Sequence, residues 1–105
     1  PVLIGGGGEK RTLRLVAQHA TMWHWFSSGE EFARKKQVLE QHCADVGRDP
    51  AEIELSVAAR GNPEVNGPAL LEQGSTLFTV GISGPDFDLS TARAWVDWRN
   101  KSTIA

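Results

Sequence analysis

Apolar positions along the chain alternate between short continuous runs and stripes at helical spacing. The first run, residues 2–4, ends at four consecutive glycines, residues 5–8. Beyond the glycines, apolar residues recur at intervals of three and four, as on one face of a helix. These residues are Leu13, Val16, Ala17 and Ala20. The first 20 residues therefore predict a strand, a glycine-rich turn and a helix.

The next stretch predicts a second strand and a long helix. Residues 22–26 form a short apolar and aromatic run, which is typical of a buried strand. Ser28 followed by Glu31 has the spacing of a capping box, so a helix should begin there. Gly47 would cap its carboxyl end, and Pro50 forbids its continuation. The stripe on this helix comprises Phe32, Lys35, Leu39, His42, Cys43 and Val46, with the Lys35 stem covering part of it.

The same alternation continues in the second half of the chain. Residues 52–59 alternate and turn apolar at their end, which predicts a third strand. Residues 60–68 are rich in glycine, proline and asparagine and predict a loop. Residues 69–73 can form only a short helix, and Gly74 ends it.

A fourth strand and a last helix complete the pattern. The strand is expected at residues 77–82 and a turn-rich loop at 83–88, and Asp88 is the expected N-cap of a helix that follows. Strands alternating with helices indicate an α/β fold of parallel βαβ units. Right-handed crossovers would bring the glycine turn, residues 60–68 and residues 83–88 to one edge of the sheet. Binding sites of such folds lie at that edge.

The glycine-rich turn is the main candidate for chemistry. Glycines let the backbone approach a ligand closely, and the first turn of a helix favours an anion. The turn therefore predicts a phosphate cradle, with a flexible turn that binds nothing as the alternative. It is no P-loop, since Glu9 separates Gly8 from Lys10. The dinucleotide fingerprint also fails, because Lys10 or Arg11 stands where its third glycine belongs.

Composition and charge exclude several classes of protein. The 105 residues fit one domain with a packed core. A net charge of −2 argues against a nucleic-acid-binding protein. The single cysteine excludes an internal disulfide and favours a reducing, cytoplasmic compartment. No apolar run approaches the length of a membrane span, so no membrane partner is expected.

Four segments resemble the luciferase-like oxidoreductases that depend on a flavin or on the deazaflavin F420. They are residues 1–15, residues 17–20 leading to Trp23, residues 42–50 and residues 95–99. The first reads Pro-Val-Leu-Ile-Gly-Gly-Gly-Gly-Glu-Lys-Arg-Thr-Leu-Arg-Leu, and the third reads His-Cys-Ala-Asp-Val-Gly-Arg-Asp-Pro. The chain departs from the family where Thr21-Met22 precedes Trp23, because the family usually has Asp before this tryptophan.

The resemblance implies a TIM-type (β/α)8 barrel, which takes about 250 residues. Residues 1–105 would form one segment, the carboxyl-terminal half with about four strands. The implied activity is hydride transfer between F420, or alternatively FMN, and a small organic substrate. The implied cofactor-binding residues are Gly6, Gly7, Gly8, Glu9 and Thr12. Gly7, Gly8 and Glu9 would offer N–H groups to the cofactor phosphate, and Thr12 its hydroxyl. Catalytic residues are not assigned, since the family holds most of them in the other half.

Two further residues are candidates for a substrate pocket. His24 and Trp25 lie in the aromatic run at a strand end. The alternative for His24 is a histidine bonded to the backbone. No metal site is expected, because the histidines and Cys43 fit no zinc spacing. Cys43 is expected to be a small buried residue.

Two other functions stay open beside the enzyme. One is a non-catalytic module that binds a phosphorylated ligand, and the other is a self-assembling half-barrel without a ligand. Because the chain opens on a core strand, we expect it to be a piece of a longer protein whose turnover needs the other half. A half-barrel has two unpaired edges, at residues 2–4 or a neighbour and at 77–82, so we expect a homo-oligomer.

Overall fold

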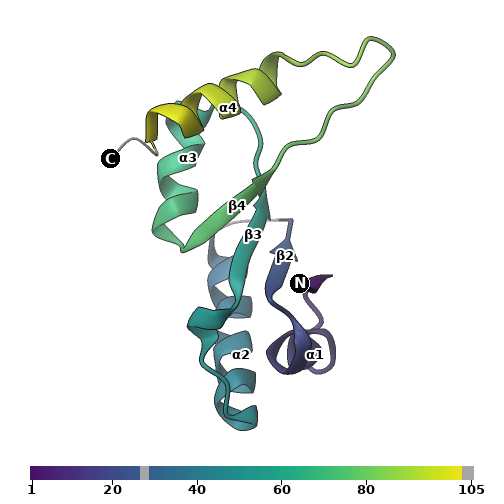
Figure 1. The fold of residues 1–105 in the computed structure, drawn as a ribbon, viewed down its shortest axis with the longest axis vertical. Coiled ribbons are helices and arrows are strands. Elements are labelled where there is room, and N and C mark those ends of the chain that lie inside the picture. Colours follow the sequence, from purple (N-terminus) through teal and green to yellow (C-terminus); the bar gives the residue numbers. More distant parts are fainter. Residues whose placement is uncertain (27–28, 103–105) are drawn as a thin grey trace.

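A computed structural model describes residues 1–26 and 29–102 as alternating strands and helices around one sheet (Figure 1). The elements are β1 (Leu3–Gly5), α1 (Thr12–His19), β2 (Met22–Trp25), α2 (Glu30–Val46), β3 (Glu54–Ala58), α3 (Pro63–Glu72), β4 (Ser75–Thr79) and α4 (Ser90–Ser102), with a 3-10 turn, η1 (Pro50–Glu52), before β3. All strand pairs are parallel, in the order β1-β2-β3-β4. The predicted α/β fold of parallel βαβ units is confirmed.

The parallel register brings the carboxyl ends of the strands to one edge. His24 pairs with Gly5 on one side and with Ser56 on the other, and Val57 pairs with Phe78. The glycine loop (residues 6–11) and the long connection after β4 therefore leave the sheet at the same edge. That connection projects away from the rest of the chain as an extended loop (Figure 1).

The four helices pack on one face of the sheet. Trp23 and Leu55, which pair across β2 and β3, lie in a core with α1 and α2. Val57 and Phe78 lie on the same face and pack with α3 and α4. Side chains alternate along a strand, so the residues between these point to the opposite face.

That opposite face, called the open face below, has no helix against it in the described parts of the chain. It is formed by Leu3, Met22, His24, Ser56, Ala58 and Leu77. Parallel sheets are normally covered on both faces. The radius of gyration, 14.8 Å, also exceeds the roughly 13 Å of a compact domain of this length. The sheet is thus one-sided.

The first core joins α1 and α2 to β2. Trp23 stacks on Phe32 with ring centroids 5.6 Å apart, and both side chains are fully buried. The predicted stripe of α1 contributes its buried side chains to this core. Gly47 ends α2 in the left-handed conformation with φ +72°, as its sequence position predicts. The expected capping residue Ser28 lies outside the described residues, and the helix begins at Glu30.

The second core is aromatic. Phe78, Trp95 and Trp98 contact one another with ring centroids 5.6–6.0 Å apart. The Trp95 Nε1 donates a hydrogen bond to the Gly61 carbonyl at 3.1 Å. Asp88 stabilises the start of α4, because its Oδ1 accepts a hydrogen bond from the Ser90 N–H at 2.9 Å, and the expected cap is confirmed.

The prediction of a loop at residues 60–68 is wrong, because most of these residues belong to α3. Asn62 caps this helix by accepting from the Glu64 N–H at 3.0 Å, and Pro63 occupies its first position. Proline there loses nothing, since the first N–H groups of a helix have no partner within it. Pro68 lies inside the helix, where it removes the N–H that would reach the Glu64 carbonyl. The fourth strand also begins earlier than predicted and ends at Thr79.

Gly67 provides a test of the second core. A β-carbon at this position would lie within 2.7 Å of three atoms of the Trp98 ring. We expect Gly67→Val to lower the free energy of unfolding by about 1–3 kcal/mol, because it overpacks the contact between α3 and α4. Gly81→Val is the control, since a β-carbon there meets nothing within 4 Å. Equal stability of the two variants in chemical denaturation would contradict this packing.

Candidate functional site

The glycine loop connects β1 to α1 and depends on glycine at two positions. Gly6 has φ +121°, a conformation that other residues rarely adopt. Gly7 is buried, and a β-carbon on it would lie 2.6 Å from the Trp25 ring and 2.9 Å from the Lys35 stem. The loop therefore lies directly on these two side chains.

Four consecutive carbonyl groups of the loop are held by the rest of the protein. Each oxygen accepts one hydrogen bond from a different donor. The Gly6 oxygen accepts from Trp23 Nε1 at 2.7 Å, Gly7 from Lys35 Nζ at 2.7 Å, Gly8 from the Leu13 N–H at 2.9 Å and Glu9 from His42 Nε2 at 2.6 Å. The donors come from β2, α1 and α2, so the loop is fixed by three elements.

The N–H groups of these peptide units point the other way. In a trans peptide the C=O and the following N–H are antiparallel, and the described chain has no cis peptide. The N–H groups of Gly7, Gly8, Glu9 and Lys10 thus face away from the donors that hold the carbonyls. Among residues 1–26 and 29–102, none of the four has an acceptor. Free N–H groups at a helix start are what an anion binds.

Thr12 adds a hydroxyl to the same loop. A β-carbon on Gly8 would lie 2.8 Å from Thr12 Oγ1, so the hydroxyl sits beside the Gly8 backbone. The exposed side chains of Lys10 and Arg11 precede it and make the loop basic. The structure thus brings Gly6, Gly7, Gly8, Glu9 and Thr12 together at the start of α1.

The Glu9 side chain is already engaged with cations. Its Oε2 lies 3.1 Å from Lys35 Nζ and 3.2 Å from the Arg34 guanidinium. The hydrogen bond from Lys35 is the main reason that the pKa of Glu9 lies below its usual value. Glu9 is therefore ionised at neutral pH and neutralised locally, and what it can offer an anion is its N–H.

Lys35 and His42 contact the candidate site, and the sequence interpretation missed both contacts. Lys35 was expected only to cover an apolar stripe with its stem, but its ammonium group binds the loop twice. It also lies 5.4 Å from the centroid of the Trp25 ring. A lysine and a histidine inside an apolar stripe were the available signal, because a buried polar group needs a partner.

His24 and Trp25 lie on opposite faces of the sheet. His24 is on the open face, where Nδ1 lies 2.9 Å from Ser56 Oγ and the ring meets Phe26 edge-on at 5.2 Å. Trp25 packs on the helix side beneath the glycine loop. Its Nε1 is buried and finds no acceptor among the described residues. The two predicted pocket residues therefore do not share a pocket.

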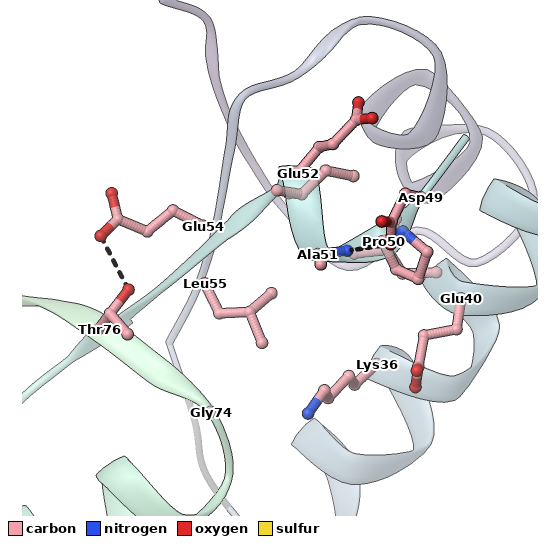
Figure 2. Close-up of a pocket in the computed structure, with 12 residues that line it drawn as sticks. Lys36, Glu40, Asp49, Pro50, Ala51, Glu52, Glu54, Leu55, Gly74 and Thr76 are labelled. Carbon is pink, nitrogen blue, oxygen red and sulfur yellow. Dashed lines mark hydrogen bonds between the residues drawn. The ribbon is translucent and has the colours of Figure 1, made fainter.

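A cavity of about 570 Å³ lies at the other edge of the sheet, beside the starts of β3 and β4 (Figure 2). Three of its carboxylates are occupied: Asp49 accepts from the Ala51 N–H at 2.9 Å, Glu54 from the Thr76 hydroxyl at 2.8 Å and Glu52 from Arg48 Nε at 3.3 Å. It contains none of the predicted site residues. In the described chain no three His, Cys, Asp or Glu side chains gather to hold a metal.

Cys43 does not form a reactive site. The thiol is fully buried on α2 in the first core, and burial raises its pKa. A protonated thiol without access to solvent is a poor nucleophile.

No family model, curated protein or solved structure matches the chain. None of the helices in the described ranges has the length and apolar character to cross a membrane.

The contribution of Lys35 to the loop can be measured against its neighbour. Lys35→Met leaves the buried Gly7 carbonyl without a donor, so we expect a loss of about 1–3 kcal/mol in the free energy of unfolding. Arg34→Met removes a cation from the same Glu9 carboxylate but no hydrogen bond to a backbone carbonyl of the loop. It should cost less, since exposed ion pairs contribute little. Equal losses in urea denaturation would show that Lys35 acts only through Glu9.

Proposed function

We propose that this chain is the cofactor-phosphate-binding part of a luciferase-like oxidoreductase. Its reaction would transfer hydride between F420, with FMN as the alternative, and a small organic substrate. The observation that carries the proposal is the glycine loop, whose carbonyls are held inward while four consecutive N–H groups and the Thr12 hydroxyl have no partner in the described chain. A phosphate monoester offers oxygens that accept from such donors.

The one-sided sheet supports the half-barrel part of the proposal. A closed (β/α)8 barrel has parallel strands in sequential order and its helices on the outer face. Four sequential parallel strands with helices on a single face fit half of such a barrel. The open face would then be the interior, and the glycine loop would lie at the carboxyl edge where barrel sites are found.

The cofactor would supply the redox chemistry, and this chain would bind and orient it. The N–H groups of Gly7, Gly8 and Glu9 would hold the phosphate, with the Thr12 hydroxyl as a further donor. Gly6 would provide the turn that lets the backbone approach. No residue is assigned to the hydride transfer itself. A cytoplasmic location fits the single buried cysteine.

Two alternatives remain as proposals of another class. A non-catalytic module that binds a phosphorylated ligand would use the same loop. A self-assembling α/β unit is favoured by the open face and by the free edges of β1 and β4.

Substitutions in the loop test the phosphate site. Gly8→Val places atoms against Thr12 Oγ1 and should abolish close approach of the ligand. Thr12→Ala removes one hydrogen bond to a charged group, worth about 1.5–3 kcal/mol, or about 10- to 150-fold in the dissociation constant of FMN. Thr91→Ala, at an exposed position on α4, is the control. Unchanged FMN titrations for both loop variants would rule out the assignment.

The open face predicts self-association of the 105-residue chain. A second copy could pair with the free edges and remove apolar side chains such as Leu3, which is 54% exposed, from water. We expect a dimer or larger species in light scattering, and a shift toward monomer for Leu3→Lys. Val65→Lys on α3 is the control, since Val65 is also exposed but lies away from both edges. A folded 11.4 kDa monomer of the parent chain would contradict the prediction.

A further inference from the structure

The last helix, α4, differs from the other helices in the strands that it meets. α1 shares a core with Ile4 of β1 and Trp23 of β2, the strands before and after it. α3 likewise shares a core with Val57 of β3 and Phe78 of β4. α4 packs beside β4, which is the last strand of the sheet in the described chain. The pattern of the other helices therefore predicts a further strand beside β4.

An apolar groove of about 440 Å³ lies between β4 and α4, where that strand would lie. Phe78 and Val80 line it from β4, and Ala92, Trp95 and Val96 line it from α4. Val96 is 45% exposed. The side chains of a strand beside β4 would cover this apolar surface, and its removal from water would stabilise the contact.

The backbone of β4 is free to pair at the same edge. The Thr79 carbonyl accepts a hydrogen bond from the Ala59 N–H at 2.8 Å, so Thr79 directs its polar backbone groups toward β3. Successive residues of a strand direct these groups to alternate sides. The N–H and C=O of Phe78 therefore point away from the sheet. Unpaired groups at an edge are a template for another strand.

β1, at the opposite edge of the sheet, has the features of the strand that is expected there. The backbone groups of Val2 and Gly6 pair toward β2, so those of Leu3 and Gly5 point away from the sheet. The side chains of Val2 and Leu3 are 47% and 54% exposed. One chain thus carries an apolar strand with a free edge and, at the other end of its sheet, a groove that fits such a strand.

Charges at the carboxyl edge favour a parallel contact between β1 of one copy and β4 of another. In that orientation the glycine loop of one copy lies beside residues 80–89 of the other, because both segments follow the paired strands. Residues 80–89 contain Asp86 and Asp88 and no lysine or arginine. The glycine loop carries the exposed cations Lys10 and Arg11. The two loops would attract each other, whereas an antiparallel contact would place them at opposite edges.

We propose that β1 of a second copy of this chain docks in the groove between β4 and α4, parallel to β4. A two-fold axis makes the reverse contact identical, so two sheets of four strands close into one barrel of eight. Side chains fill the interior of an eight-stranded barrel, and here the two open faces supply them. The inference rests on the half-barrel of the proposed function and adds the partner and the surface that binds it.

Two substitutions break this contact from opposite sides. Val96→Lys places an ammonium group in the groove. Leu3→Pro removes an N–H at the outer edge of β1, where proline leaves the pairing with β2 intact. We expect the parent chain at twice 11.4 kDa in light scattering, and each variant should raise the dissociation constant of the dimer about 10-fold or more. Val46→Lys, at a valine 37% exposed at the end of α2, is the control and should change nothing.

A mixture of the two variants gives the decisive measurement. A dimer of either variant alone has two defective contacts. A mixed dimer has one contact with both defects and one between an unaltered groove and an unaltered β1. We therefore expect the equimolar mixture to associate more tightly than either variant by itself. Circular dichroism checks that each variant is folded, and Val2→Lys replaces Leu3→Pro if that variant is not.

Three results would overturn the docking site. They are a monomeric parent chain, a dimer that Val96→Lys leaves unchanged, as for contact through the open faces alone, and a mixture no tighter than its components, as for two β4 edges pairing with each other. The phosphate site is tested separately by titrating the parent chain with FMN. A dimer assembled in this way that binds no FMN overturns the phosphate site alone, and a monomer that binds FMN overturns the docking site alone.

Discussion

The buried ammonium group of Lys35 is the interaction on which the glycine loop depends. An ammonium removed from water needs compensating partners, because an unpaired buried charge is very costly. Lys35 obtains three: the Gly7 carbonyl, the Glu9 carboxylate and the face of the Trp25 ring. Two of these partners belong to the loop, so α2 and the loop must fold against each other. The orientation of the Gly7 carbonyl follows, and with it the outward direction of the Gly8 N–H.

The parallel sheet places the glycine loop beside the end of a second strand, β2. Because every strand runs in the same direction, the loop after β1 and the end of β2 leave at one edge. Because all four helices lie on one face, each side chain at that edge points either toward the helices or toward the open face. Trp25 supports the loop from the helix side, and His24 remains accessible on the other face. One aromatic segment thus presents adjacent side chains to both faces of the sheet.

Local features of the fold could be predicted from the sequence, because their causes are local. Gly47 and Asp88 act within a few residues of their position, and the structure places both as expected. The glycine loop was also recognisable as a tight turn, since four consecutive glycines stand between an apolar run and a helical stripe. The helix at Pro63–Glu72 was missed because its proline and glycine content outweighed the short Asn-Pro start signal.

The contacts that shape the candidate site could not be predicted in this way. Lys35 and Gly7 are 28 residues apart, and His42 and Glu9 are 33 apart, so no periodic pattern links them. The sequence also did not show on which face of the sheet His24 and Trp25 lie. A four-residue strand of mostly aromatic residues shows no alternation of apolar and polar positions that would say which side faces the helices.

The charges around the loop indicate how it would recognise an anion. Glu9 neutralises part of the charge of Lys35 and Arg34, so neither ammonium nor guanidinium is free to act as the lysine of a P-loop does. The cations that remain, Lys10 and Arg11, are exposed, and salt screens exposed charges. Salt has less effect on hydrogen bonds from the N–H groups of the loop, whose directions are fixed by the contacts of the neighbouring carbonyl groups. The loop would therefore select a phosphate by donor geometry, with charge as a weaker, long-range attraction.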